Sequence, residues 1–134
     1  KYMYNARKLV YIDFSFYNYD RRRTDSITGE KFREANLDAC WAFRERVDFF
    51  DKHGIKSLER KMNDIYCWLL LDRIYQCYCQ QVNGPKVKAL VELAKQDVEY
   101  LQQHDVDPWY IEEFKLLSKG LEKYGMARSV RERK

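Results

Sequence analysis

Helical periodicity, interrupted by residues that end helices, is the feature that most limits the folds open to this chain. Between residues 30 and 125, apolar residues recur at steps of three and four, which is the spacing of one face of an α-helix. Gly54, Asn83-Gly84-Pro85 and Asp107-Pro108 separate these stretches, since glycine and proline end helices and favour turns. The pattern predicts helices over residues 30–53, 57–82, 85–103 and 108–124, with Gly125 ending the last.

The way these helices pack follows from their connections and from the second helix. Short connections favour antiparallel packing of sequential helices. Residues 65–71 of the second helix are apolar nearly all round, which is typical of a central helix contacted on several sides. The chain has 134 residues, of which 46% are hydrophobic, enough for one core. The sequence therefore predicts a mainly α fold, an antiparallel bundle of about four helices.

The N-terminal part has a different pattern. After a helix end at residues 1–8, the residues from Leu9 to Tyr19 are β-branched and aromatic without a helical period, which predicts an extended strand. A lone strand cannot pair its own backbone groups, and no other stretch of the sequence resembles a strand. We therefore expect a segment left over from an upstream α/β domain. The expected division is 1–28 as the end of that domain, 29–125 as a helical domain and 126–134 as a basic, flexible tail.

The stretch from Phe14 to Thr28 is the best candidate for a binding site in this sequence. It combines aromatic residues with three consecutive arginines, Arg21 to Arg23. Guanidinium groups bind phosphate oxygens through paired hydrogen bonds, and neighbouring aromatic rings can stack on a base or a sugar. The same pattern also fits a solvated basic loop behind a buried aromatic strand. The residues alone leave both interpretations open.

This stretch resembles a motif of bacterial family 2 glycosyltransferases of the GT-A type. In that family, a late strand of the catalytic domain is followed by a Tyr/Arg-rich segment and then by a helical C-terminal region. Asp20 stands where the family often places tyrosine directly before arginine. The residues that match the motif are Tyr17, Tyr19, Arg21, Arg23, Ser26 and Ile27.

The resemblance implies that the chain is the C-terminal fragment of an enzyme that acts in polysaccharide synthesis. Such an enzyme transfers a sugar from a nucleotide-diphosphate sugar to a glycan or lipid-linked acceptor, in the cytoplasm and at the inner face of the membrane. By position, Arg21 and Arg23 would lie near the donor diphosphate or the acceptor, and Tyr17 and Tyr19 would line that cleft. The catalytic residues and the Mg or Mn ion would belong to the upstream catalytic domain, so the fragment alone would be inactive.

Other partners follow from the charge and the unpaired strand. A stand-alone helical interaction module without catalytic activity is the alternative, with homo-oligomers formed through residues 9–19. The net charge of +4 is concentrated in Arg21 to Arg23 and in the tail, which argues against a nucleic-acid footprint. Two such clusters support at most a peripheral contact with an anionic membrane.

The remaining polar residues have simpler explanations. Cys77 and Cys79, with His53 or His104, form a poor metal set because positions two apart on a helix point to different sides. The cysteines are expected to be reduced core residues. We expect Asp105-Val106-Asp107 to form a loop that ends in a helix cap. Neither histidine stands at a catalytic spacing from a serine or cysteine.

Overall fold

The structure is a computed structural model that describes residues 5–8, 10 and 32–133. The chain divides into two units, Lys1–Lys31 and Phe32–Lys134. In the first unit, residues 5–8 and Val10 are exposed to solvent. The remainder of the predicted strand over residues 9–19 and the whole predicted loop over residues 20–29 lie outside the described residues.

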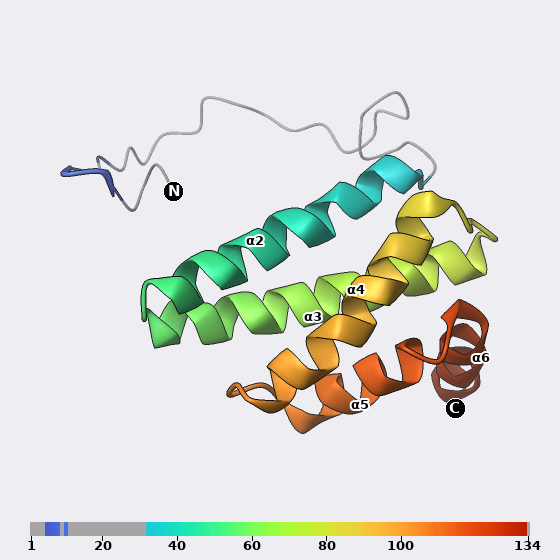
Figure 1. Ribbon diagram of the computed structural model, residues 1–134. Coiled ribbons are helices and arrows are strands. Elements are labelled where there is room, and N and C mark those ends of the chain that lie inside the picture. The colour runs from blue at the N-terminus through green and yellow to red at the C-terminus, as the bar shows by residue number, and fades with distance from the viewer. Residues whose placement is uncertain (1–4, 9, 11–31, 134) are drawn as a thin grey trace. The chain divides into compact units, whose positions relative to one another are not determined.

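The second unit is helical, which confirms the predicted mainly α class. Its described residues form a short 3-10 turn and five α-helices rather than the four expected. In chain order these are η1 (Glu34–Leu37), α2 (Asp38–Lys52), α3 (Lys56–Cys79), α4 (Pro85–Gln102), α5 (Pro108–Leu117) and α6 (Leu121–Glu132) (Figure 1).

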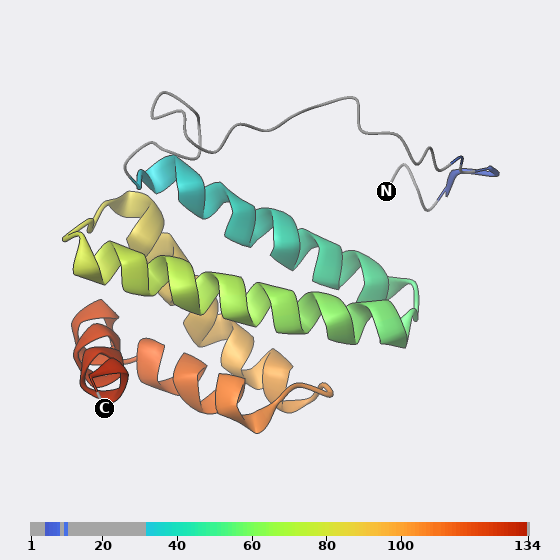
Figure 2. The ribbon, with the colours of Figure 1, turned by 180° about the vertical axis from the view of Figure 1, so that it is seen from behind.

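The helices are arranged around α3. Helices α2 and α3 lie side by side, and α4 crosses them obliquely, as Figures 1 and 2 show from opposite sides. Helix α5 packs against α4 and α3, and α6 packs against the C-terminal part of α3 and against α5. Since α3 contacts every other element of the unit, the prediction that the second helix is central is confirmed.

Local signals explain several helix ends. Gly54 has a φ of +67°, and its N–H donates to the carbonyl of Asp51 while that of Ile55 donates to the carbonyl of Phe50. These two bonds form a Schellman motif, which a left-handed glycine permits. At the start of α5, the Asp107 carboxylate accepts a 2.8 Å hydrogen bond from the N–H of Trp109. The predicted cap at Asp107 is therefore confirmed.

The predicted fourth helix is wrong in one respect, because it is two helices. The break falls after Leu117, and Gly120, with a φ of +117°, is the N-cap residue of α6. Gly125 lies inside α6, where a Cβ atom would stand 2.1 Å from Cγ of Tyr78. The glycine thus permits close packing of α6 on α3 instead of ending a helix. Residues 126–132, expected as a flexible tail, continue α6.

Helix α3 contributes more residues to the core than any other helix. Tyr66, Leu70 and Leu71 are at most 1% exposed, whereas Trp68 on the outer face is 56% exposed. All four cysteines are free. Cys40, Cys67 and Cys77 are buried and Cys79 is exposed, so the last two face different sides of α3. Among the helices that the structure describes, none has the length and apolar character needed to cross a bilayer.

Candidate functional site

The residues singled out by the Tyr/Arg motif have no described geometry. Tyr17, Tyr19, Arg21 and Arg23 all lie outside the described residues. The described helices instead bring together polar residues from α2, α3 and α4. These residues form two neighbouring groups, which we call the Asp97 cluster (Arg44, Tyr66 and Asp97) and the His104 cluster (Asp51, Lys56, Glu59 and His104).

The Asp97 cluster joins three helices through one buried carboxylate. Asp97 of α4 is 3% exposed, and its Oδ2 accepts a 2.6 Å hydrogen bond from the hydroxyl of Tyr66 in α3. Nε of Arg44 in α2 lies 2.9 Å from Oδ1 and 3.1 Å from Oδ2. Burial raises the pKa of the Asp97 carboxyl, although the Tyr66 hydroxyl and the Arg44 guanidinium oppose that shift. Burial also raises the pKa of Tyr66.

Tyr100 connects the two clusters. The guanidinium carbon of Arg44 lies 4.5 Å from the centroid of the Tyr100 ring, and the ring stacks on His104 at a centroid distance of 3.9 Å. The Tyr100 hydroxyl reaches Oε1 of Glu59 at 3.4 Å. Tyr100 therefore links the Asp97 cluster and the His104 cluster into one continuous set of polar contacts.

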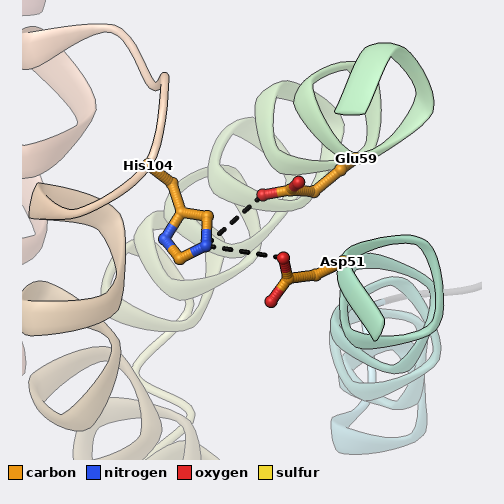
Figure 3. A group of neighbouring side chains, drawn as sticks. All are labelled: Asp51, Glu59 and His104. Atoms are coloured by element: carbon orange, nitrogen blue, oxygen red, sulfur yellow. Dashed lines mark ion pairs between the residues drawn. The ribbon is translucent and has the colours of Figure 1, made fainter. Parts of the chain in front are cut away.

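The His104 cluster lies where the end of α2, the start of α3 and the segment after α4 meet (Figure 3). Nε2 of His104 is 3.5 Å from Oε1 of Glu59 and 3.7 Å from Oδ1 of Asp51. The side chain of Glu59 is 4% exposed, that of His104 18% and that of Asp51 36%. The three side chains point toward one another, with one ligand atom from each within 4.8 Å of the others.

A backbone contact fixes the orientation of the His104 ring. Nδ1 lies 2.7 Å from the carbonyl oxygen of Tyr100. A carbonyl oxygen only accepts hydrogen bonds, so Nδ1 must carry the hydrogen. The nitrogen that faces the two carboxylates is therefore Nε2, which bears a lone pair whenever the imidazole is neutral.

Lys56 supplies positive charge at the edge of this cluster. Its Nζ donates to Oδ1 of Asp51 at 2.9 Å and to Oε2 of Glu59 at 2.8 Å. The hydrogen bond from Lys56 lowers the pKa of the Asp51 carboxyl, and the two carboxylates raise the pKa of Lys56. The lysine side chain is 69% exposed, so it borders the cluster from the solvent side.

The other sequence candidates have different partners from those of the two clusters. Asp105 pairs with Arg60 at 2.9 Å on the surface, while Asp107 caps α5. The carboxylates of Asp105 and Asp107 thus have separate structural roles. His53 sits at the end of α2, where its Nδ1 is 2.7 Å from the carbonyl oxygen of Phe49.

Sequence reasoning missed the His104 cluster because its members are far apart in the chain. The local signal was limited to Asp51 and Glu59 on either side of the Gly54 turn, with Lys56 between them. His104 arrives only through the packing of α4 on the helix pair. No family model, curated protein or solved structure matches this chain.

Proposed function

We propose that this chain is the C-terminal part of a family 2 glycosyltransferase, in which residues 32–133 form a non-catalytic helical domain. The position of the Tyr/Arg motif carries the proposal. Ile27, the last residue that matches the motif, lies five positions before Phe32, where the helical unit begins. A helical region directly after this motif is the order that the resemblance implies.

The buried charges of the helical domain support its non-catalytic role. Asp97 is held by Arg44 and Tyr66. Glu113, which is 5% exposed, is held by both terminal nitrogens of Arg131 at 2.5 and 2.8 Å. Carboxylates engaged in this way hold helices together and are not available as general acids or bases.

In the proposed enzyme, the upstream domain binds the nucleotide-diphosphate sugar with an Mg or Mn ion and carries the catalytic residues. Arg21 and Arg23 contact the donor diphosphate or the acceptor, because guanidinium groups bind phosphate oxygens in pairs. Tyr17 and Tyr19 line the same cleft. The acceptor is a glycan or a lipid-linked sugar, and the reaction takes place at the cytoplasmic face of the membrane.

The test begins with the reading frame upstream of Lys1, which we expect to encode an α/β domain with Asp-x-Asp. The full-length protein is then assayed for release of nucleoside diphosphate from nucleotide sugars. We expect Arg21→Ala and Arg23→Ala to reduce turnover at least tenfold. Arg46→Ala is the matched control, because Arg46 lies over the Phe43 ring on α2. An upstream frame without that domain, or equal turnover in all three variants, would overturn the proposal.

A second candidate function, a stand-alone interaction module, is favoured by one surface. Leu58, Ile65 and Trp68 lie on one face of α3 and are 39%, 40% and 56% exposed. Apolar side chains gathered on a helix face suit contact with a second copy of the chain. This candidate predicts a dimer in sedimentation velocity that Trp68→Ser weakens. A monomer at every concentration tested contradicts it.

A further inference from the structure

We propose that Asp51, Glu59 and His104 form a binding site for a divalent transition metal ion, of which zinc is the best chemical match. The site is independent of the proposed glycosyltransferase activity, whose Mg or Mn ion belongs to the upstream domain. It would join three segments of the helical domain: the end of α2, the start of α3 and the residues after α4 (Figure 3).

The spacing of the ligand atoms fits a tetrahedral ion. Zinc binds histidine nitrogen and carboxylate oxygen at about 2.0–2.2 Å, so two ligands of one tetrahedral ion stand roughly 3.3–3.6 Å apart. Nε2 of His104 lies 3.5 Å from Oε1 of Glu59 and 3.7 Å from Oδ1 of Asp51. The three ligand atoms all lie within 4.8 Å of one another, so bringing both carboxylates onto one ion would take side-chain movements of up to roughly 1.5 Å.

The orientation of His104 is a second argument for a cation. The carbonyl of Tyr100 holds the hydrogen on Nδ1, so a neutral ring directs its Nε2 lone pair at two carboxylates. Three electron-rich atoms that face one another attract a cation. Lys56 supplies a positive charge to the two carboxylates, and a metal ion would supply one to Nε2 of His104 as well. Metal-binding histidines commonly donate their other N–H to a backbone carbonyl, which fixes the ring as it is fixed here.

The polar surroundings of Glu59 provide a third argument. Asn63, one helical turn further along α3, is 1% exposed, and its Oδ1 has no hydrogen-bond partner among the described residues. The hydroxyl of Tyr100 donates to Oε1 of Glu59 at 3.4 Å. A buried acceptor without a partner, such as Oδ1 of Asn63, is commonly explained by a bound water or ion nearby.

Lys56 determines how an ion enters. Its Nζ donates hydrogen bonds to Oδ1 of Asp51 and Oε2 of Glu59. A metal ion that binds Oδ1 of Asp51 would therefore displace the lysine ammonium from that oxygen. The lysine side chain is 69% exposed, and its ammonium can turn into water at little cost. A surface recess opens onto the site, lined by Lys56, Glu59, Arg60, Gln103, His104 and Asp105.

Zinc titration of the tag-free, chelator-treated protein tests the proposal. All proteins carry Cys79→Ser, which removes the exposed thiol. We expect one zinc per chain by isothermal titration calorimetry and a rise in melting temperature with zinc concentration. His104→Ala should weaken binding roughly 100-fold, whereas His53→Ala, at the other histidine, should leave it unchanged. Lys56→Gln should strengthen binding severalfold, because it removes the competing ammonium.

The outcomes separate a built site from surface binding. Absence of binding at about 100 μM zinc, or equal affinity in the His104→Ala and His53→Ala proteins, overturns the proposal. Weaker binding in Lys56→Gln would also contradict it, since that result would make the lysine a support of the site. All the variants are first checked for native helix content by circular dichroism. The turnover assay of Arg21 and Arg23 variants reports on the glycosyltransferase proposal separately.

Discussion

The guanidinium of Arg44 and the carboxylate of Asp97 form a buried ion pair that links α2 to α4. Nε of Arg44 lies 2.9 Å and 3.1 Å from the two oxygens, and the side chains are 16% and 4% exposed. The hydroxyl of Tyr66 adds a third hydrogen bond from α3. One carboxylate therefore fixes the positions of three helices relative to one another.

Removal of Asp97 should strongly destabilise the fold. In Asp97→Ala, Arg44 keeps a largely buried charge without its main partner, and we expect a loss of about 3–5 kcal/mol in the free energy of unfolding. Asp48→Ala is the matched control, because Asp48 pairs with the same arginine but is 60% exposed. Its loss should stay below about 1 kcal/mol. Urea unfolding followed by circular dichroism measures both.

A double variant tests whether the Arg44–Asp97 ion pair contributes more to the specificity of helix packing than to the free energy of unfolding. Replacement of both charges in Arg44→Met with Asp97→Leu removes the unpaired charge that each single variant leaves behind. We expect the double variant to be more stable than Asp97→Ala by roughly 1–4 kcal/mol. The interpretation fails if the double variant is the least stable of the set, since the pair would then be a net stabiliser in its own right.

Gly125→Ala should destabilise the protein although alanine favours helices. A Cβ atom at this position would stand 2.1 Å from Cγ of Tyr78, and overpacking of this kind costs about 1–3 kcal/mol. The gain in helix propensity is about 1 kcal/mol at most. Combination with Tyr78→Ala should remove most of the added cost of the alanine. Thermal unfolding of the four proteins of this cycle tests the coupling, and additive effects would contradict it.

Gly125 also shows which parts of the fold could be predicted from sequence. The ends at Gly54, Pro85 and Asp107 were predictable because the groups that form them lie within a few residues of one another. Gly120 and Gly125 look equivalent in sequence. Tertiary packing places the ring of Tyr78 against Gly125, which lies within α6, whereas Gly120 takes a positive φ between two helices.

The same distinction applies to the candidate site. From the local sequence, Lys56 and Glu59 are predicted to form an ordinary ion pair three residues apart on a helix. His104 is predicted to lie in a connection between helices. Their convergence with Asp51 depends on how α4 crosses the α2–α3 pair, which no local pattern encodes. The Tyr/Arg motif, which the sequence did single out, lies outside the described residues and stays a prediction.

The cysteines should differ sharply in reactivity toward thiol reagents. Cys79 is exposed, whereas the other three are buried. Burial raises the pKa of Cys40 to about 12 and that of Cys77 to about 11, and it also raises the pKa of Cys67. Their thiolate fractions at neutral pH are therefore very small.

We expect Ellman's reagent to modify one thiol rapidly in the native protein and all four in denaturant. In Cys79→Ser, the rapid phase should disappear while three thiols remain accessible after unfolding. Rapid modification of a second thiol in the native protein would show that one of the buried positions opens readily, against the packing seen around α3.

Stability should fall in alkaline solution because of Tyr124. Burial raises the pKa of its hydroxyl to about 12 from an ordinary value of 10.0, and the hydroxyl donates to the carbonyl of Leu71 at 3.2 Å. Between pH 10 and 12 the unfolded chain releases a proton that the folded chain keeps. The free energy of unfolding therefore decreases with pH, by up to about 1.4 kcal/mol per pH unit from this residue.

Urea unfolding at pH 8, 10 and 11 measures this slope against Tyr124→Phe. The phenylalanine variant should start from a lower stability at pH 8, because the hydrogen bond to Leu71 is lost. Its stability should nevertheless decline less steeply above pH 10, since it has no hydroxyl to ionise. Equal slopes in the two proteins would mean that other groups with raised pKa values, among them Tyr100 at about 12, account for the alkaline loss, and that the Tyr124 hydroxyl titrates alike in the folded and unfolded chains.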